Sequence, residues 1–161
     1  MKDPLSKNPK IATPFELFKM AEAYYLGNLV KQDLNKALEL WPQAAENGHP
    51  LSQYRLAMFY RDGQVVEANL EESFKWLTKA AKLGYPEARF ALGEAYESGQ
   101  PYGEQNQVEA VGWYLKAVEN RLAAAQLKVG NLHSTENGLE KNPELAFQYY
   151  QLATGQGEVS A

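Results

Sequence analysis

The sequence predicts an all-α fold, a solenoid of four tandem helix–turn–helix repeats with about eight helices, because two landmarks recur along it with one period. The first landmark is an aromatic position, found at Tyr24, Tyr60, Tyr96 and His133. The second is a small-residue position, found at Ala44, Ala80, Ala117 and Ala153. Both return after about 36 residues, a spacing typical of helical repeats. The repeats are therefore expected over residues 14–49, 50–85, 86–122 and 123–157.

Each repeat is predicted to contain two amphipathic helices. In the first helix, apolar residues recur three and four positions apart, as at Leu56, Ala57 and Tyr60, which places them on one face. The second helix repeats this spacing around Trp76 and Ala80. The alternation of apolar and polar residues that marks strands is absent. A single pair of helices cannot bury such faces, so stacked repeats are expected to share one core.

One bulky position of the second helices is expected to fill that core, at Trp76, Trp113 and Tyr149. Small residues of the first helices, such as Gly93, are expected to let the helices approach each other beside it. Trp76 should then be buried between the helices of its own repeat and the next repeat. Its replacement by alanine is expected to cost about 3–5 kcal/mol, the range for large core truncations.

Helix start and stop signals fall at matching positions of the repeats. Prolines at the expected first helical position are Pro14, Pro50 and Pro86. Residues expected to cap the N-termini of the second helices are Asp33, Asn69, Asn106 and Asn142. Glycines expected to end second helices in a left-handed turn are Gly48, Gly84 and Gly157. The third repeat has Arg121 instead, and we expect Asn120 to take the left-handed turn there. Pro42 should kink its helix.

These residues resemble the Sel1-like repeat (SLR) family, a relative of the tetratricopeptide (TPR) repeat. The third repeat follows the family pattern in order at Ala88, Leu92, Gly93, Tyr96, Gly99, Asn106, Ala110, Trp113, Tyr114 and Ala117. The resemblance covers residues 14–157. It implies a right-handed α-solenoid and a role as adaptor, scaffold or regulator that binds another protein. The fourth repeat departs from the pattern at His133 and Glu136, as terminal repeats often do.

Composition narrows the classes of partner. The net charge is −4 with no basic cluster, which argues against a nucleic-acid partner. The absence of cysteine excludes disulfides and thiolate metal sites. No apolar run approaches the ~20 residues of a membrane span, so no membrane insertion is expected. The polar stretch after Lys2 is no leader peptide, which predicts a cytoplasmic protein, or a periplasmic one if the chain is a trimmed mature segment. Residues 1–13 are expected to form a flexible tail.

No catalytic, metal or cofactor site is predicted, and we expect no enzyme. His49 and His133 are the only histidines, and neither has a cysteine or a second histidine at metal-ligand spacing. The carboxylates are scattered and fit a solvated helix surface better than an acid/base pair. Two alternatives stay open: a hydrolase with an unrecognised site, and a structural repeat that self-assembles through the open ends of the solenoid.

The TPR-like geometry implies that the first helices line a concave groove. The residues expected to face it and bind a protein or peptide partner are Phe15, Glu22, Tyr25, Leu51, Met58, Arg61, Glu94, Glu97 and Asn131. This mixture suits a helix or peptide with apolar anchors and a basic segment. A sharper form of the hypothesis is an immunity or inhibitor protein for a bacterial toxin or enzyme. Lysines at Glu94 and Glu97 are expected to weaken binding at low salt while the fold tolerates them.

Overall fold

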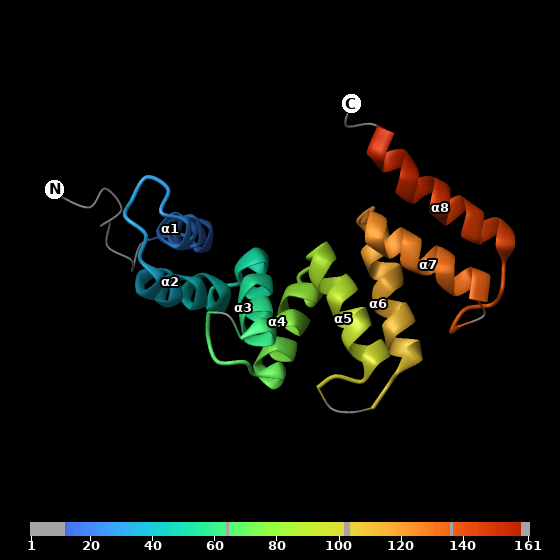
Figure 1. The fold of residues 1–161 in the computed structure, drawn as a ribbon, viewed down its shortest axis with the longest axis horizontal. Coiled ribbons are helices and arrows are strands. Elements are labelled where there is room, and N and C mark those ends of the chain that lie inside the picture. Colours follow the sequence, from blue (N-terminus) through green and yellow to red (C-terminus); the bar gives the residue numbers. More distant parts are fainter. Residues whose placement is uncertain (1–11, 64, 102–103, 136, 159–161) are drawn as a thin grey trace. The chain divides into compact units, whose positions relative to one another are not determined.

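The computed structural model describes residues 12–63, 65–101, 104–135 and 137–158. Most of the expected N-terminal tail, and Glu136, therefore lie outside the described residues. The described part of the chain contains α-helices and no strand (Figure 1). The helices are α1 Pro14–Leu26, α2 Leu34–Glu46, α3 Pro50–Asp62, α4 Leu70–Lys82, α5 Pro86–Ser98, α6 Gln107–Glu119, α7 Ala123–Thr135 and α8 Pro143–Glu158. The all-α helical repeat fold predicted from the sequence is confirmed.

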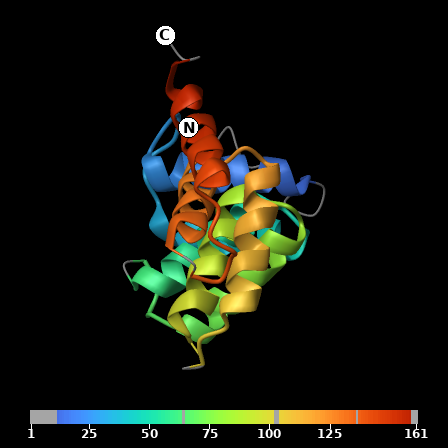
Figure 2. The ribbon, with the colours of Figure 1, turned by 90° about the vertical axis from the view of Figure 1, so that its right-hand side faces the viewer.

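The chain forms two compact units, Met1–Leu83 with α1 to α4 and Gly84–Ala161 with α5 to α8. Inside each unit the helices of one repeat pack on each other, as α1 on α2 and α7 on α8. The second helix of the first repeat in each unit also packs on the next first helix, α2 on α3 and α6 on α7. Figure 2 gives a second view of the helix pairs. No helix among the described residues is long and apolar enough to cross a membrane.

Local capping chemistry sets most helix starts as predicted. Thr13 and Glu16 form a reciprocal capping box at α1, where the Thr13 hydroxyl accepts the Glu16 N–H. The second helices begin after side-chain caps, with Asn69 accepting the Glu72 N–H as one example. The other second-helix caps are Asp33, Asn106 and Asn142. Pro42 lies inside α2, and the helix runs through it without interruption.

Two predicted helix ends are wrong. Arg121 adopts the left-handed conformation with φ of 60°, whereas Asn120 keeps φ of −87°. The turn after α6 therefore falls at the position of the missing glycine, so the geometry of the repeat prevails over the better local propensity of asparagine. In the last repeat, α8 runs through Gly157 to Glu158, so Gly157 does not end the helix.

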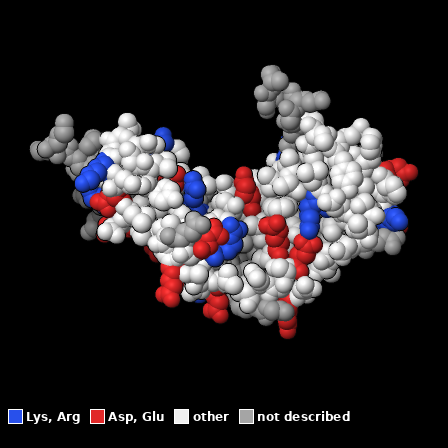
Figure 3. Space-filling view, in the orientation of Figure 1, with Lys and Arg blue, Asp and Glu red and all other residues white. Residues whose placement is uncertain are grey.

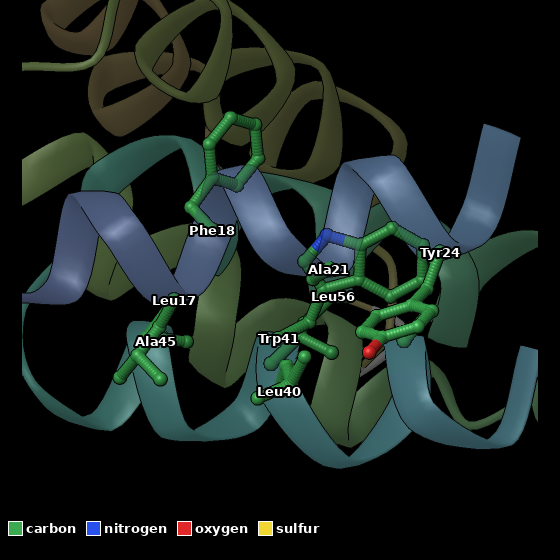
Figure 4. Close-up of a cluster of buried hydrophobic side chains, with 10 residues drawn as sticks. Leu17, Phe18, Ala21, Tyr24, Leu40, Trp41, Ala45 and Leu56 are labelled. Atoms are coloured by element: carbon green, nitrogen blue, oxygen red, sulfur yellow. The ribbon is translucent and has the colours of Figure 1, made fainter. Parts of the chain in front are cut away.

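In the first and third repeats the buried aromatic of the second helix lies one position later than predicted, and in the second repeat Leu77 takes that place. Trp41, which Figure 4 shows, and Tyr114 are fully buried, whereas Trp76 and Trp113 are only partly buried. Lys79 and Lys116 lie over the latter rings, with Nζ 4.0 and 3.9 Å from the ring centroids. Such cation–π contacts are typical of half-exposed tryptophan. Trp76 packs against the core cluster of the first unit but is only partly buried, so the prediction that it is a buried core residue holds only in part.

The surroundings of Gly93 show why Tyr114, and not the preceding Trp113, is the core residue of α6. A Cβ atom at Gly93 would lie 2.6 Å from Cε1 of Tyr114, and one at Gly130 would lie 2.7 Å from Cε1 of Tyr150. The small residues of the first helices therefore make room for Tyr114 and Tyr150, not for Trp113 and Tyr149. Because Tyr114 is fully buried, its ring has little freedom to move aside.

We expect Gly93→Ala to lower the free energy of unfolding by about 1–2 kcal/mol, because overpacking at Tyr114 outweighs the helix propensity that alanine adds. Gly112→Ala is the matched control. Gly112 lies in α6, where an added Cβ would meet nothing within 4 Å, so the same change should stabilise by up to about 1 kcal/mol. Urea unfolding followed by circular dichroism measures both. Equal effects of the two substitutions would mean that Tyr114 does not fix the helix spacing.

Candidate partner-binding surface

In the first unit, the predicted groove residues lie on α1 and α3. Glu22 accepts a hydrogen bond from Arg55 across the two helices, with Nη2 3.2 Å from Oε2. The Tyr25 ring packs against Trp41 and Phe59, with centroids 5.1 and 6.0 Å apart. Glu22 and Tyr25 are therefore held by contacts within the unit.

The other four predicted residues of this unit divide by exposure. Leu51 and Met58 are partly buried, and Leu51 packs against the hydrophobic core. Phe15 is exposed and has the Lys19 Nζ 5.1 Å from its ring centroid. Arg61 is exposed and contacts Asp62, with Nε 2.7 Å from Oδ1. An exposed aromatic ring and an exposed guanidinium are the groups of α1 and α3 best placed to meet a partner.

In the second unit, Glu97 is held in an internal network. Its carboxylate accepts hydrogen bonds from the Tyr114 hydroxyl at 2.8 Å and from Lys128 Nζ at 2.6 Å, joining α5, α6 and α7. Burial opposes ionisation of this carboxyl, but the hydrogen bonds from Lys128 and Tyr114 and the Lys128 charge outweigh burial and lower the pKa of Glu97. Burial, together with the adjacent carboxylate, raises the pKa of Tyr114. Both groups therefore stay in their ordinary charge states near neutral pH.

Glu97 therefore does not belong to a tolerant surface, which corrects the expectation that lysine there leaves the fold unchanged. Glu94, one turn earlier on α5, is exposed. Asn131 on α7 is also exposed and accepts a hydrogen bond from the Tyr150 hydroxyl at 2.8 Å. Glu94 and Asn131 are the predicted groove residues of this unit that remain accessible.

Sequence reasoning missed the basic residues that pair with the predicted acids, Arg55 and Lys128. Each stands one position before the central aliphatic residue of its first helix, Leu56 or Val129. A lysine occupies the same position before Met20. The third repeat has Ala91 at this position, so the recurrence is incomplete, but in both ion pairs the basic residue meets an acid of the preceding first helix.

Histidine serves structure at both of its positions, as predicted. His49 caps α3: its Nδ1 accepts the Ser52 N–H at 3.2 Å and lies 2.9 Å from the Ser52 hydroxyl. Its ring packs on Phe18 with centroids 4.7 Å apart. His133 has Nδ1 2.9 Å from the Glu140 carbonyl oxygen and stacks on Tyr149. Among the described residues, no group of three or more histidine or acidic side chains is placed to hold a metal ion.

We expect the α3 cap to fail in acid. Burial lowers the pKa of His49, so the folded state prefers the neutral ring whose Nδ1 can accept the Ser52 N–H. Stability is then fully present above the unfolded pKa of about 6.5 and is lost as pH falls below it. His49→Asn keeps a capping side chain that does not titrate. The free energy of unfolding, measured at pH 7.5 and at pH 5.0, should fall more for the wild type than for this variant. An equal fall in both proteins would contradict the capping role.

The described residues of the first helices carry charges of both signs. Figure 3 shows acidic and basic side chains interspersed with neutral ones on the face that it draws, within each unit. The described ion pairs, such as Glu22 with Arg55 and Glu97 with Lys128, neutralise part of the charge on the first helices.

Helix pairs with a recurring small residue and capped turns define the class of helical-repeat proteins. The sequence pattern of the Sel1 repeat matches residues 17–49, 50–85, 86–121 and 123–158. The chain therefore belongs to the Sel1 repeat family, and the predicted resemblance is confirmed. Comparison with curated proteins finds no match.

Solved structures support the fold. The protective antigen c5321 of uropathogenic Escherichia coli, which has an SLR fold, is 27% identical with a TM-score of 0.85 over 95% of this chain and 32% of that chain. A Sel1 repeat protein of Oxalobacter formigenes is 29% identical with a TM-score of 0.83, over 95% of this chain and 62% of the other. Cysteine rich protein B of Helicobacter pylori is 26% identical with a TM-score of 0.58, over 81% and 93% of the two chains. The chain thus spans less than two thirds of the first two relatives.

Proposed function

We propose that this chain binds a protein or peptide partner through the exposed residues of its first helices. Sel1 repeat proteins are generally protein-interaction modules, and the repeat is a scaffold fold that is not typically enzymatic. The observation that carries the proposal is the set of accessible side chains on these helices. In the first unit they are Phe15 and Arg61, and in the second they are Glu94 and Asn131.

The chemistry of these residues suggests what each contributes. Phe15 offers an exposed apolar ring, which can anchor a partner by entering an apolar pocket. Glu94 offers a carboxylate that can pair with a basic segment, and such rim charges act mainly on the association rate. Glu22, Tyr25, Leu51, Met58 and Glu97 then support this surface from inside each unit. A regulator that occupies a toxin or another enzyme is one form of this proposal.

The test uses a photo-cross-linking amino acid placed at Phe15, Arg61 or Glu94 in the full chain, with capture from cells and mass spectrometry. Lys75, exposed on α4, provides the matched position on a second helix. One protein captured from the first-helix positions and not from position 75 is the expected result. The same protein captured only from position 75 would move binding to the second helices and overturn the proposal.

The captured partner then permits a charge test. Glu94→Lys should weaken binding at low salt, by an amount that shrinks as salt rises, because exposed charges are screened within about 8–10 Å. Glu46→Lys, the same reversal at the exposed end of α2, should bind as the wild type does. Equal weakening by both variants would show only a general charge effect and would remove Glu94 from the binding surface.

A further inference from the structure

Two asparagines of the chain, Asn47 and Asn137, are each followed by glycine. Asparagine is thermolabile in proteins. It reacts most readily before glycine, because glycine has no Cβ that would restrict the approach of its backbone nitrogen to the preceding side chain. The same dipeptide thus occurs in two settings, at the end of α2 and in the loop between α7 and α8. The local structure decides which of the two can react.

At the end of α2, both reacting groups of the dipeptide are held by hydrogen bonds. The side-chain amide of Asn47 donates to the Gln43 carbonyl oxygen at 2.7 Å, one turn back on the helix. The Gly48 N–H donates to the Ala45 carbonyl oxygen at 3.0 Å. Asn47 is also the C-cap of α2. Attack of the glycine nitrogen on the asparagine side chain would have to break both hydrogen bonds.

In the loop before α8, the reacting groups are not held in this way. Asn137 is exposed, and its carbonyl oxygen accepts a hydrogen bond from Gln107 Nε2 at 3.2 Å. Within the described ranges, neither the Asn137 side chain nor the Gly138 N–H has a hydrogen-bond partner. The side-chain carbonyl carbon of Asn137 and the backbone nitrogen of Gly138 can therefore meet without loss of a bond to the rest of the unit.

We propose that Asn137 is a site of spontaneous deamidation and isomerisation, whereas the fold protects Asn47. The Gly138 backbone nitrogen loses its proton and attacks Cγ of Asn137. The new bond between nitrogen and Cγ closes a cyclic succinimide, the bond from Cγ to Nδ2 breaks, and ammonia leaves with the proton. Water then opens the ring. Cleavage between the nitrogen and Cγ gives aspartate, and cleavage between the nitrogen and the main-chain carbonyl carbon gives isoaspartate.

The isoaspartyl product does not fit the loop, because its backbone is longer by a carbon atom. Gly138 lies against α6: a Cβ placed on it would be 2.8 Å from Gln107 Cγ and 3.0 Å from Val111 Cγ2. The next residue, Leu139, packs against the hydrophobic cluster that contains Val111 and Val129. An added backbone atom therefore has to displace Gly138 from α6 or Leu139 from this cluster. Either displacement loosens the packing of the second unit.

Peptide mapping by mass spectrometry tests the proposal on the full chain stored in mildly alkaline buffer. Deamidation appears as the mass gain of an amide converted to an acid, and chromatography separates aspartyl from isoaspartyl peptides. In the folded protein, Asn137 should react at least about tenfold faster than Asn47, which corresponds to about 1.4 kcal/mol in activation free energy. In urea, which removes the hydrogen bonds at the end of α2, the two rates should converge. Equal rates in the folded protein, or a ratio that persists in urea, would overturn the proposal.

Thermal unfolding of the stored protein tests the effect on packing. The melting temperature should fall as the isoaspartyl fraction rises. Asn137→Gln, whose longer side chain closes such a ring far more slowly, should keep its melting temperature on storage, and Asn47→Gln, the matched control, should lose it as the wild type does. Freshly prepared Asn137→Asp carries the new charge on an unchanged backbone, so it should melt close to the wild type. A stored wild type that contains isoaspartate at this position and melts unchanged would refute the displacement of the loop.

Discussion

Trp41→Ala is expected to lower the free energy of unfolding of the first unit by about 3–5 kcal/mol. Trp41 is fully buried, and Figure 4 shows it among Ala21, Tyr24 and Leu56 from neighbouring helices. Its ring also packs on Phe59 of α3, with centroids 4.8 Å apart. The truncation would open a cavity between α1, α2 and α3. Urea unfolding followed at 222 nm measures the loss.

Trp76→Ala is the comparison that decides which tryptophan position holds the repeat together. Trp76 is partly buried, and Lys79 covers one face of its ring, so we expect a smaller cost of about 1–2 kcal/mol. The two variants remove the same atoms from equivalent helices, which isolates the effect of burial. A larger loss for Trp76→Ala than for Trp41→Ala would reverse the assignment of core positions drawn from the structure.

The helix boundaries could be predicted from the sequence because their causes are local. A proline at the first helical position, or an Asn69 that accepts an N–H three residues later, acts within one turn of chain. The constant repeat length then indicated where each local signal should recur in the other repeats. The turn at Arg121 shows where this fails, because the left-handed conformation there is imposed by the connection between α6 and α7 and not by the propensity of the residue.

The core aromatic could not be chosen from the pattern. In the third repeat Trp113 and Tyr114 are adjacent, and adjacent helical positions differ by about 100° in direction. Both fit an amphipathic face, and only the partner helix decides which points inward. The contact between the Gly93 position and the Tyr114 ring makes that choice, and it joins residues on different helices.

The candidate surface was predicted in outline and not in detail. Glu94 is exposed on a first helix, and its place in a partner-binding groove stays a prediction. The same reasoning treated Glu97 as equivalent, since the two acids lie one turn apart on α5. Glu97 differs in its hydrogen bond with Lys128, which lies on α7 and is 31 residues from Glu97 along the chain. A pairing across repeats depends on side-chain reach, which position in the repeat does not specify.

Glu97→Lys is therefore expected to lower the free energy of unfolding of the second unit by about 2–3 kcal/mol. The change removes two hydrogen bonds to a charged acceptor, each worth roughly 1.5–3 kcal/mol before solvent screening of this partly exposed group. It also sets a second ammonium group beside Lys128. Glu94→Lys, an equal charge change one turn away at an exposed site, should stay within about 0.5 kcal/mol of the wild type.

Glu97→Gln separates charge from shape. The amide oxygen can still accept a hydrogen bond from Tyr114 or Lys128, so Glu97→Gln should lower the free energy of unfolding less than Glu97→Lys does. The difference between the wild type and Glu97→Gln should also depend on pH. Because the folded pKa of Glu97 is lowered, its charge contributes stability above the unfolded value of about 4.3, and this contribution is lost as pH falls through the folded pKa. The wild type should thus exceed Glu97→Gln at pH 7 and approach it near pH 3. A difference that persists unchanged at pH 3 would show that the network acts through packing, with the Glu97 charge contributing nothing.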